Sequence, residues 1–170
     1  GNGNYSDSNV PVLISSLTGI TAIAAGTNQS LALKNDSTVW AWGSNTYGQL
    51  GNGTNGMSST SNVPIQVDSL TDIIAIAGAD EHSLALKSDG TVWAWGNNTF
   101  GELGNGTNTD SNVPVLVSSL TGVIAISGGG YYSLALKSDS TVWAWGFNLY
   151  GELGNGTNTS NNVPVPVSFL

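Results

Sequence analysis

The chain has 170 residues, of which 39% are hydrophobic and 8% are charged, and its formal net charge is −8. With three basic residues against 11 acidic ones, the composition excludes a cationic groove for nucleic acid and attraction to an anionic membrane surface. The lack of cysteine excludes disulfides, a thiol nucleophile and a cysteine zinc site, and a single histidine leaves catalytic triads and histidine clusters incomplete. No apolar stretch is long enough to span a bilayer, and no signal peptide begins at Gly1.

One unit occurs three times along the chain. It contains Thr-Val-Trp-Ala-Trp-Gly, whose second tryptophan is Trp42, Trp95 and Trp145, at intervals of 53 and 50 positions. Ser-Leu-Ala-Leu-Lys and a Val-Pro pair recur in the same phase. A period near 50 residues is typical of stacked supersecondary units such as propeller blades.

In chain order, each unit is predicted to form four short strands. In the first unit, residues 20–25 form a small apolar strand, and Leu31 and Leu33 share one face of the second. An Asp-containing turn leads to the Trp-Ala-Trp strand, because Asp bonds its own backbone. A glycine-rich stretch then precedes a fourth strand at 63–67, whose proline suits a sheet edge. Four strands per unit make one blade.

Six tryptophans stand in the third strands of the three units. Two readings are open: a stacking platform for a ligand, or packing between blades. The regular strand position favours packing, because large flat side chains fill a tapering interface. The residues predicted to pack between blades are Trp40, Trp42, Trp93, Trp95, Trp143 and Trp145.

The order of these motifs resembles the regulator of chromosome condensation repeat family. A glycine, Ser-Leu-Ala-Leu, an Asp turn, Val-Trp-Ala-Trp-Gly and Gly-Gln/Glu-Leu-Gly follow one another over nearly the whole chain. The resemblance implies four-stranded blades of closed propellers, usually about seven. Family units usually carry His before Ser-Leu-Ala-Leu; here His82 keeps it, while Gln29 and Tyr132 stand at the matching places.

The predicted fold is all-β, a propeller-type array of three four-stranded blades plus one surplus N-terminal strand. Residues 1–17 repeat the phase of 104–120 and of 154–170, so they predict a strand without a blade of its own. Closed propellers typically need about four to eight blades. The chain is therefore expected to be a window of a longer array or to associate with copies of itself. The predicted blades cover residues 18–70, 71–120 and 121–170.

A few residues that differ between units are candidate contacts for a protein partner. Asp80, Glu81 and His82 form the only run of three titratable side chains, but alternation along a strand favours a structural role over metal binding or proton transfer. Tyr131 and Tyr132 are a candidate exposed pair, because aromatic residues are enriched at binding hot spots. Met57 lies where the first unit carries three extra residues. We expect no catalytic, cofactor or metal site.

Asn-Gly-Thr triplets recur in the glycine-rich loops and are potential N-glycosylation acceptors at Asn52, Asn105 and Asn155. They matter only in an exported protein. The acidic surface, rich in Asn, Ser and Thr, together with the scarcity of lysine and the absence of cysteine, favours an extracellular or cell-surface location.

Three classes of function remain open on these grounds. The first is a non-enzymatic structural protein whose blades assemble between copies by strand sharing into a propeller or filament, a homo-oligomer. The second is a protein-binding module within a larger closed propeller, which the family resemblance implies because members regulate small GTPases or inhibit β-lactamases. The third is an enzyme, for which no nucleophile, base and orienting group stand out. The surplus strand favours the first.

Overall fold

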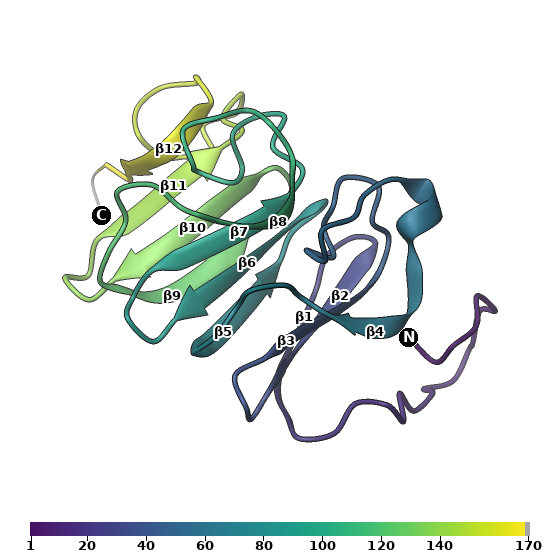
Figure 1. Ribbon diagram of the computed structural model, residues 1–170. Helices are drawn as coiled ribbons and strands as arrows, with labels where there is room; N and C mark the ends of the chain where they lie inside the picture. Colours follow the sequence, from purple (N-terminus) through teal and green to yellow (C-terminus); the bar gives the residue numbers. More distant parts are fainter. Residues whose placement is uncertain (169–170) are drawn as a thin grey trace.

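The computed structural model describes residues 1–168 and is built from three four-stranded antiparallel sheets. Phe169 and Leu170, which end the third predicted blade, lie outside the described residues. Each sheet is formed by strands consecutive in sequence, so each is one blade, and blades 1 and 3 lie on either side of blade 2 (Figure 1). The strands are β1 (Ile20–Ala25), β2 (Gln29–Lys34), β3 (Val39–Gly43) and β4 (Ser61–Gln66) in blade 1; β5 (Ile73–Gly78), β6 (His82–Lys87), β7 (Val92–Gly96) and β8 (Ser111–Leu116) in blade 2; and β9 (Val123–Gly128), β10 (Tyr132–Lys137), β11 (Val142–Gly146) and β12 (Asn161–Pro166) in blade 3. This arrangement confirms the predicted all-β array of three four-stranded blades.

The predicted turn between the second and third strands is held by its aspartate. Asp36 Oδ1 accepts hydrogen bonds from Thr38 N at 3.1 Å and Thr38 Oγ1 at 2.6 Å, while Ser37 takes a positive φ of 65°. The bonds from Thr38 are the main reason why the pKa of Asp36 falls to about 2, with Lys34 contributing. The same aspartate-to-threonine bonds recur in the other blades, so the turn fixes the hairpin register in all three.

The fourth strands β4, β8 and β12 form the outer edges of their sheets and contain the repeated proline. An edge position suits proline because it has no N–H to donate to a further strand. The first strands β1, β5 and β9 contact one another in succession, and β5 and β9 also contact the second strand of the preceding blade, so they lie where neighbouring blades meet.

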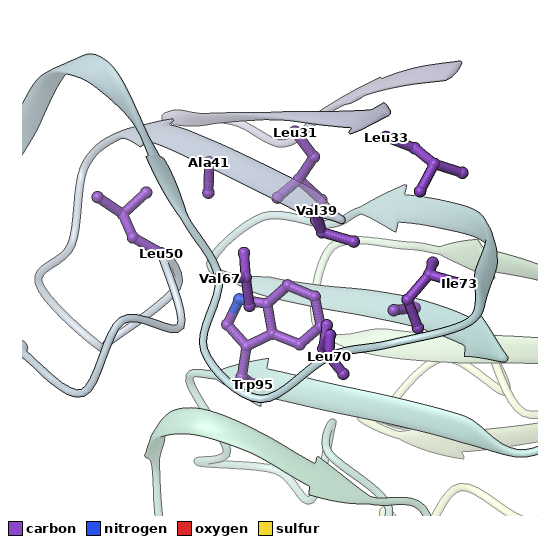
Figure 2. Packing of buried hydrophobic residues seen from close by; sticks show 10 residues of the cluster. Leu31, Leu33, Val39, Ala41, Leu50, Val67, Leu70, Ile73 and Trp95 are labelled. Atoms are coloured by element: carbon purple, nitrogen blue, oxygen red, sulfur yellow. The ribbon is translucent and has the colours of Figure 1, made fainter. Parts of the chain in front are cut away.

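The hydrophobic core lies between blades. One cluster combines Leu31, Leu33 and Val39 of blade 1 with Ile73 and Trp95 of blade 2, as Figure 2 shows, where the Trp95 indole lies beside Val67 below the blade 1 strands. An equivalent cluster joins blade 2 to blade 3. Blades 1 and 2 therefore each present a leucine face to the next blade along the chain and receive that blade's alanine and tryptophan face.

Residues 1–17 differ from the expectation, because they contain no strand. The segment runs along blade 1 as an irregular chain (Figure 1). A strand needs a neighbouring strand to satisfy its backbone groups, and the phase of residues 1–17 matches a fourth strand, which pairs with a third strand in blades 1 to 3. No third strand among the described residues lies beside residues 1–17, so the predicted surplus strand is not formed.

Candidate protein-binding surface

Loops from all three blades gather at one end of the sheets. Because neighbouring strands are antiparallel, the connection from the first to the second strand and the connection from the third to the fourth emerge on the same side. We call this side the loop end; it comprises residues 26–28, 44–60, 79–81, 97–110, 129–131 and 147–160. Four of the predicted contact residues, Met57, Asp80, Glu81 and Tyr131, lie in these loops.

Four aromatic rings form a contiguous group at the loop end of blades 2 and 3. Phe100 packs edge-on against Tyr131 with ring centroids 5.6 Å apart and against Phe147 at 4.9 Å, and Phe147 packs against Tyr150 at 6.2 Å. Phe100 and Phe147 are half-buried, whereas Tyr150 is 82% exposed. We call this group the aromatic surface. Exposed clustered aromatics are typical of protein-binding hot spots.

Carboxylates border the aromatic surface. The hydrogen bond to Asp80 and the charge of its carboxylate raise the pKa of the Tyr131 phenol, so these two predicted residues meet. Glu81 Oε2 accepts a hydrogen bond from Asn97 Nδ2 at 3.1 Å, while burial, and then the charge of Asp80, raise the pKa of Glu81. Asp110 Oδ1 accepts a bond from Asn98 N at 2.8 Å and adds to the negative charge near Glu81. The surface thus combines apolar rings with an acidic border.

His82 does not belong to this surface. It begins β6 and is fully buried, and burial lowers its pKa to about 4. Its Nε2 lies 2.9 Å from Ser133 Oγ of blade 3, so the side chain links two blades. Gln29 links blades at the matching place in blade 1, where its Nε2 donates to the carbonyl oxygens of Ala79 and His82 at 3.1 Å. Asp80, Glu81 and His82 therefore do not converge on one point.

The two remaining predicted contacts make none of the ring contacts that define the aromatic surface. Tyr132 is half-buried at the start of β10. Met57 is 83% exposed in a short 3-10 helix, η1 (Met57–Ser59), within the loop of blade 1. The aromatic surface belongs to blades 2 and 3, so Met57 stands on a different blade.

The six tryptophans occupy three kinds of place. Trp95 and Trp145 are fully buried between blades, and their Nε1 atoms donate to the carbonyl oxygens of Gln49 at 2.9 Å and Glu102 at 2.7 Å in the preceding blade. Trp93 and Trp143 pack at the margins of the same two cores. In blade 1, Trp40 and Trp42 are half-buried, and no core cluster of the described residues includes them.

The asparagines of the Asn-Gly-Thr triplets fold their own loops. Asn52 Oδ1 accepts a hydrogen bond from Thr54 Oγ1 at 2.8 Å, and Asn105 and Asn155 make the same bond with the threonine two residues on. The buried Asn45 completes the loop by donating to Thr54 O at 3.0 Å and accepting from Leu50 N at 3.0 Å. These bonds account for the repeated asparagines without a glycan, and glycosylation remains a prediction.

The predicted contact residues did not include Phe100, Phe147, Leu149 and Tyr150. For Phe147 and Leu149, the sequence signal is a difference between the units: the matching residues are serine and threonine in blade 1 and asparagine and threonine in blade 2. Large apolar residues at loop positions that are polar in the other repeats indicate a contact surface.

The loop end contains aromatic rings and carboxylates. Within residues 1–168, no group of three or more His, Cys, Asp or Glu side chains is placed to hold a metal ion. Over the same span, no helix has the length and apolar character needed to cross a membrane. The acidic aromatic surface suits a protein partner that presents apolar and basic side chains.

The fold defines an array of propeller blades. The family model of the regulator of chromosome condensation (RCC1) repeat matches residues 36–86, 89–136 and 139–170. A second RCC1 repeat model matches residues 20–49, 73–102 and 123–152. The chain belongs to the RCC1 repeat family.

Two human ubiquitin ligases contain similar repeats. The E3 ubiquitin-protein ligase HERC2 is 36% identical over 110 residues, which are 61% of this chain and 2% of HERC2. The probable E3 ubiquitin-protein ligase HERC4 is 42% identical over 99 residues, which are 56% of this chain and 9% of HERC4. The chain therefore spans a small fraction of these relatives.

Solved propeller structures share the fold. Human WBSCR16 superposes with a TM-score of 0.76 at 26% identity, covering 88% of this chain and 38% of that protein. Prp20p from Saccharomyces cerevisiae superposes with a TM-score of 0.80 at 23% identity, covering 90% of this chain and 39% of Prp20p. The chain matches well under half of either propeller.

The expected extracellular or cell-surface location is wrong. The HERC ligases and Prp20p, the relatives that carry these repeats, are intracellular, nuclear or cytosolic proteins. Composition alone therefore does not identify the compartment.

Proposed function

We propose that the chain is a protein-binding module of a larger closed propeller, and that the partner binds at the aromatic surface. The observation that carries the proposal is the group of four contacting rings, Phe100, Tyr131, Phe147 and Tyr150, which lies among acidic side chains at the loop end. Rings in mutual contact present a large apolar area at little cost in side-chain entropy. The partner offers an apolar side chain flanked by lysine or arginine, because Asp80, Glu81 and Asp110 border the rings.

Two further points support binding rather than catalysis. Prp20p, which has the same fold, is described with its binding properties to Gsp1p and histones. We do not assign the ligase activity of the HERC proteins to this chain, because the similar region is a few per cent of their length. We therefore propose that these repeats act by binding a partner.

Selection of displayed peptides tests this proposal with a defined probe. A random peptide library is selected on the immobilised chain, and the enriched peptides are measured against Tyr150→Ala and Phe147→Ala. We expect enriched peptides with apolar and basic residues, and binding at least about tenfold weaker for both variants, as for hot-spot residues. Tyr5→Ala is the matched control, since Tyr5 is 73% exposed and belongs to residues 1–17. Peptides that bind all variants equally would refute the aromatic surface as the binding site.

A second candidate function is association of the chain with copies of itself into a propeller or filament. The observation that favours it is that one apolar blade-to-blade interface occurs twice within the chain with equivalent residues, so the blades have nearly the same apolar faces. Apolar faces of this kind associate unless they are covered. Light-scattering mass as a function of concentration tests it: growth beyond 17.4 kDa supports self-association, and a constant 17.4 kDa contradicts it.

A further inference from the structure

The three carboxylates beside the aromatic surface belong to blade 2 alone. We call Asp80, Glu81 and Asp110 the acidic border. The matching positions in blades 1 and 3 have neutral residues, although the repeats are otherwise nearly the same. These residues are Thr27, Asn28 and Thr60 in blade 1 and Gly130, Tyr131 and Ser160 in blade 3. The differences between the repeats therefore collect negative charge at one place on the loop end.

The fold brings the three carboxylates of the acidic border together. Asp80 and Glu81 lie in the loop between β5 and β6, whereas Asp110 immediately precedes β8. Burial is the main cause of the raised pKa of Glu81, and the charges of Asp80 and Asp110 both add to it. A nearby cation would have the opposite effect on this carboxyl. The acidic border is thus a group of neighbouring charges of one sign.

The lysines of the chain are placed away from the acidic border. Lys34, Lys87 and Lys137 each end a second strand, at the opposite end of the sheets from the loop end. The chain has no other basic side chain apart from its histidine. Blade 2 lies between blades 1 and 3, so its two neighbours are already in place. A partner is therefore better placed than a further blade to supply a positive charge.

Asn97 fixes the position of Glu81. The Asn97 backbone N–H donates to Glu81 O at 2.9 Å, and the side-chain Nδ2 donates to Glu81 Oε2 at 3.1 Å. The Asn97 amide is itself oriented, because Thr99 N donates to Asn97 Oδ1 at 2.8 Å. Asn97 is buried, so these bonds are shielded from water. A carboxylate that is already held in place loses little freedom when it binds a ligand.

The other two carboxylates are also held by their surroundings. Asp110 Oδ1 accepts a hydrogen bond from Asn98 N at 2.8 Å. Asp80 accepts a hydrogen bond from the Tyr131 phenol, and this bond is the main cause of the raised pKa of Tyr131. The Asp80 backbone N–H also donates to Gly130 O at 3.3 Å, which joins the loops of blades 2 and 3. The acidic border is therefore a fixed set of acceptors at the junction of these two blades.

Two rings form an aromatic wall beside these acceptors. Phe100 of blade 2 and Tyr131 of blade 3 contact each other across the same junction, with ring centroids 5.6 Å apart and ring planes at 66°. Tyr131 also bonds Asp80, so the wall and the acidic border meet at one residue. An aromatic face next to a carboxylate suits a cation that stacks on the ring while its edge donates hydrogen bonds.

The arrangement of the carboxylates favours one kind of cation. A metal ion needs oxygen ligands that converge on one point, and no such group occurs in the part of the chain that the structure describes. A guanidinium has five N–H donors on a rigid planar fork, so it can bond carboxylates that lie side by side. An ammonium is compact and strongly hydrated, and contact with the partly buried Glu81 costs it more of its water.

We infer that the acidic border binds an arginine side chain of the partner in preference to lysine, against the rings of Phe100 and Tyr131. The inference rests on the proposed function and names the residue that the aromatic surface selects. The guanidinium plane lies on an aromatic ring, and its N–H groups donate to Asp80 and Glu81. Asp110 adds negative charge, and apolar residues next to the arginine contact the other two rings of the aromatic surface.

Titration with three short peptides tests the inference. The probes are acetyl-Leu-Xaa-Leu-amides in which Xaa is arginine, lysine or citrulline, the neutral analogue of arginine. Nuclear magnetic resonance follows binding through the side-chain amide of Asn97. We expect the arginine peptide to bind about threefold tighter than the lysine peptide and about tenfold tighter than the citrulline peptide. Equal affinities, or no shift of the Asn97 amide at about 5 mM arginine peptide, overturn the inference.

The variant Glu81→Gln locates the arginine. Glutamine keeps an oxygen for the bond from Asn97 and removes the charge. We expect the arginine peptide to bind about fivefold more weakly to this variant, and its advantage over the citrulline peptide to fall by the same factor. Asp72→Asn is the matched control: Asp72 is exposed at the opposite end of the sheets, and asparagine tolerates its φ of 60°. Equal weakening by both variants means that net charge attracts the peptide, and it overturns the inference.

The outcomes separate this inference from the proposed function. Tyr150→Ala and Phe147→Ala can weaken the binding of library-selected peptides while lysine or citrulline replaces arginine without loss. In that case the aromatic surface stands as the binding site and the arginine preference is overturned. In the opposite case, the arginine preference depends on Glu81 while both ring variants bind the selected peptides normally. The acidic border then stands, and the four-ring surface is wrong.

Discussion

His82 Nε2 of blade 2 lies 2.9 Å from Ser133 Oγ of blade 3, and the Ser133 hydroxyl in turn donates to the Glu102 carbonyl at 3.0 Å. These two contacts connect blade 2 with blade 3, and they are shielded from solvent because His82 and Ser133 are both fully buried. An interface that contains buried titratable groups makes stability depend on pH.

The protein with His82 is expected to lose stability in mild acid, and the variant His82→Gln is expected to keep it. Burial lowers the pKa of His82 from 6.5 to about 4, so between these values the unfolded chain binds a proton that the folded chain does not. The contribution of neutral His82 to the free energy of unfolding is complete above pH 6.5. As pH falls towards 4, the free energy of unfolding decreases by about 3 kcal/mol. Urea unfolding of both proteins at several pH values measures this, and an equally steep decline in His82→Gln would show that another group is responsible. Gln stands at this place in blade 1.

Changing Glu102 to Gln is expected to have the opposite pH dependence. Burial raises the pKa of Glu102 from 4.5 to about 6, so the stabilisation from the protonated acid is present below pH 4.5 and is lost as pH rises through 6. Glu102→Gln places a neutral group at this position, where blade 1 has Gln49. The variant should be about 2 kcal/mol more stable to unfolding than the unaltered protein at pH 7, and the two proteins should be nearly equal in stability at pH 4. Thermal unfolding at the two pH values checks this, with Glu152→Gln as the control. Equal gains at both pH values would contradict it.

The equivalent tryptophans Trp95 and Trp42 should differ in their contribution to folding. Trp95 is fully buried between blades and donates to Gln49 O, so Trp95→Ala is expected to cost about 3–5 kcal/mol. Trp42 has the same sequence context but is half-buried on blade 1, and Trp42→Ala should cost less than half as much in dilute solution. The free energies of unfolding in urea compare them directly, and similar losses would mean that burial between blades is not what stabilises Trp95.

The periodic parts of the fold could be predicted from the sequence, because they repeat local chemistry. The Asp36 turn and the Trp40-Ala41-Trp42 strand each depend on neighbours within a few residues, and they recur in every unit. The aromatic surface could not be predicted in the same way, since Phe100, Tyr131 and Phe147 come from three loops that meet only after the blades stack. The same holds for residues 1–17: their pattern is that of a strand, but a strand requires a partner that pattern alone does not supply.

The loop glycines Gly101 and Gly151 provide a final matched comparison of blade packing. Both have positive φ, 90° and 87°, so alanine at either place costs about 1 kcal/mol in backbone strain. Only at Gly101 does the added Cβ meet the neighbouring blade, at Asn162, while at Gly151 it meets nothing within 4 Å. Gly101→Ala should therefore destabilise the protein by about 1–3 kcal/mol more than Gly151→Ala, because the loop must move away from the next blade. Thermal unfolding of the two variants in dilute solution measures the difference, and equal melting temperatures would mean that the loops of blade 2 do not press against blade 3.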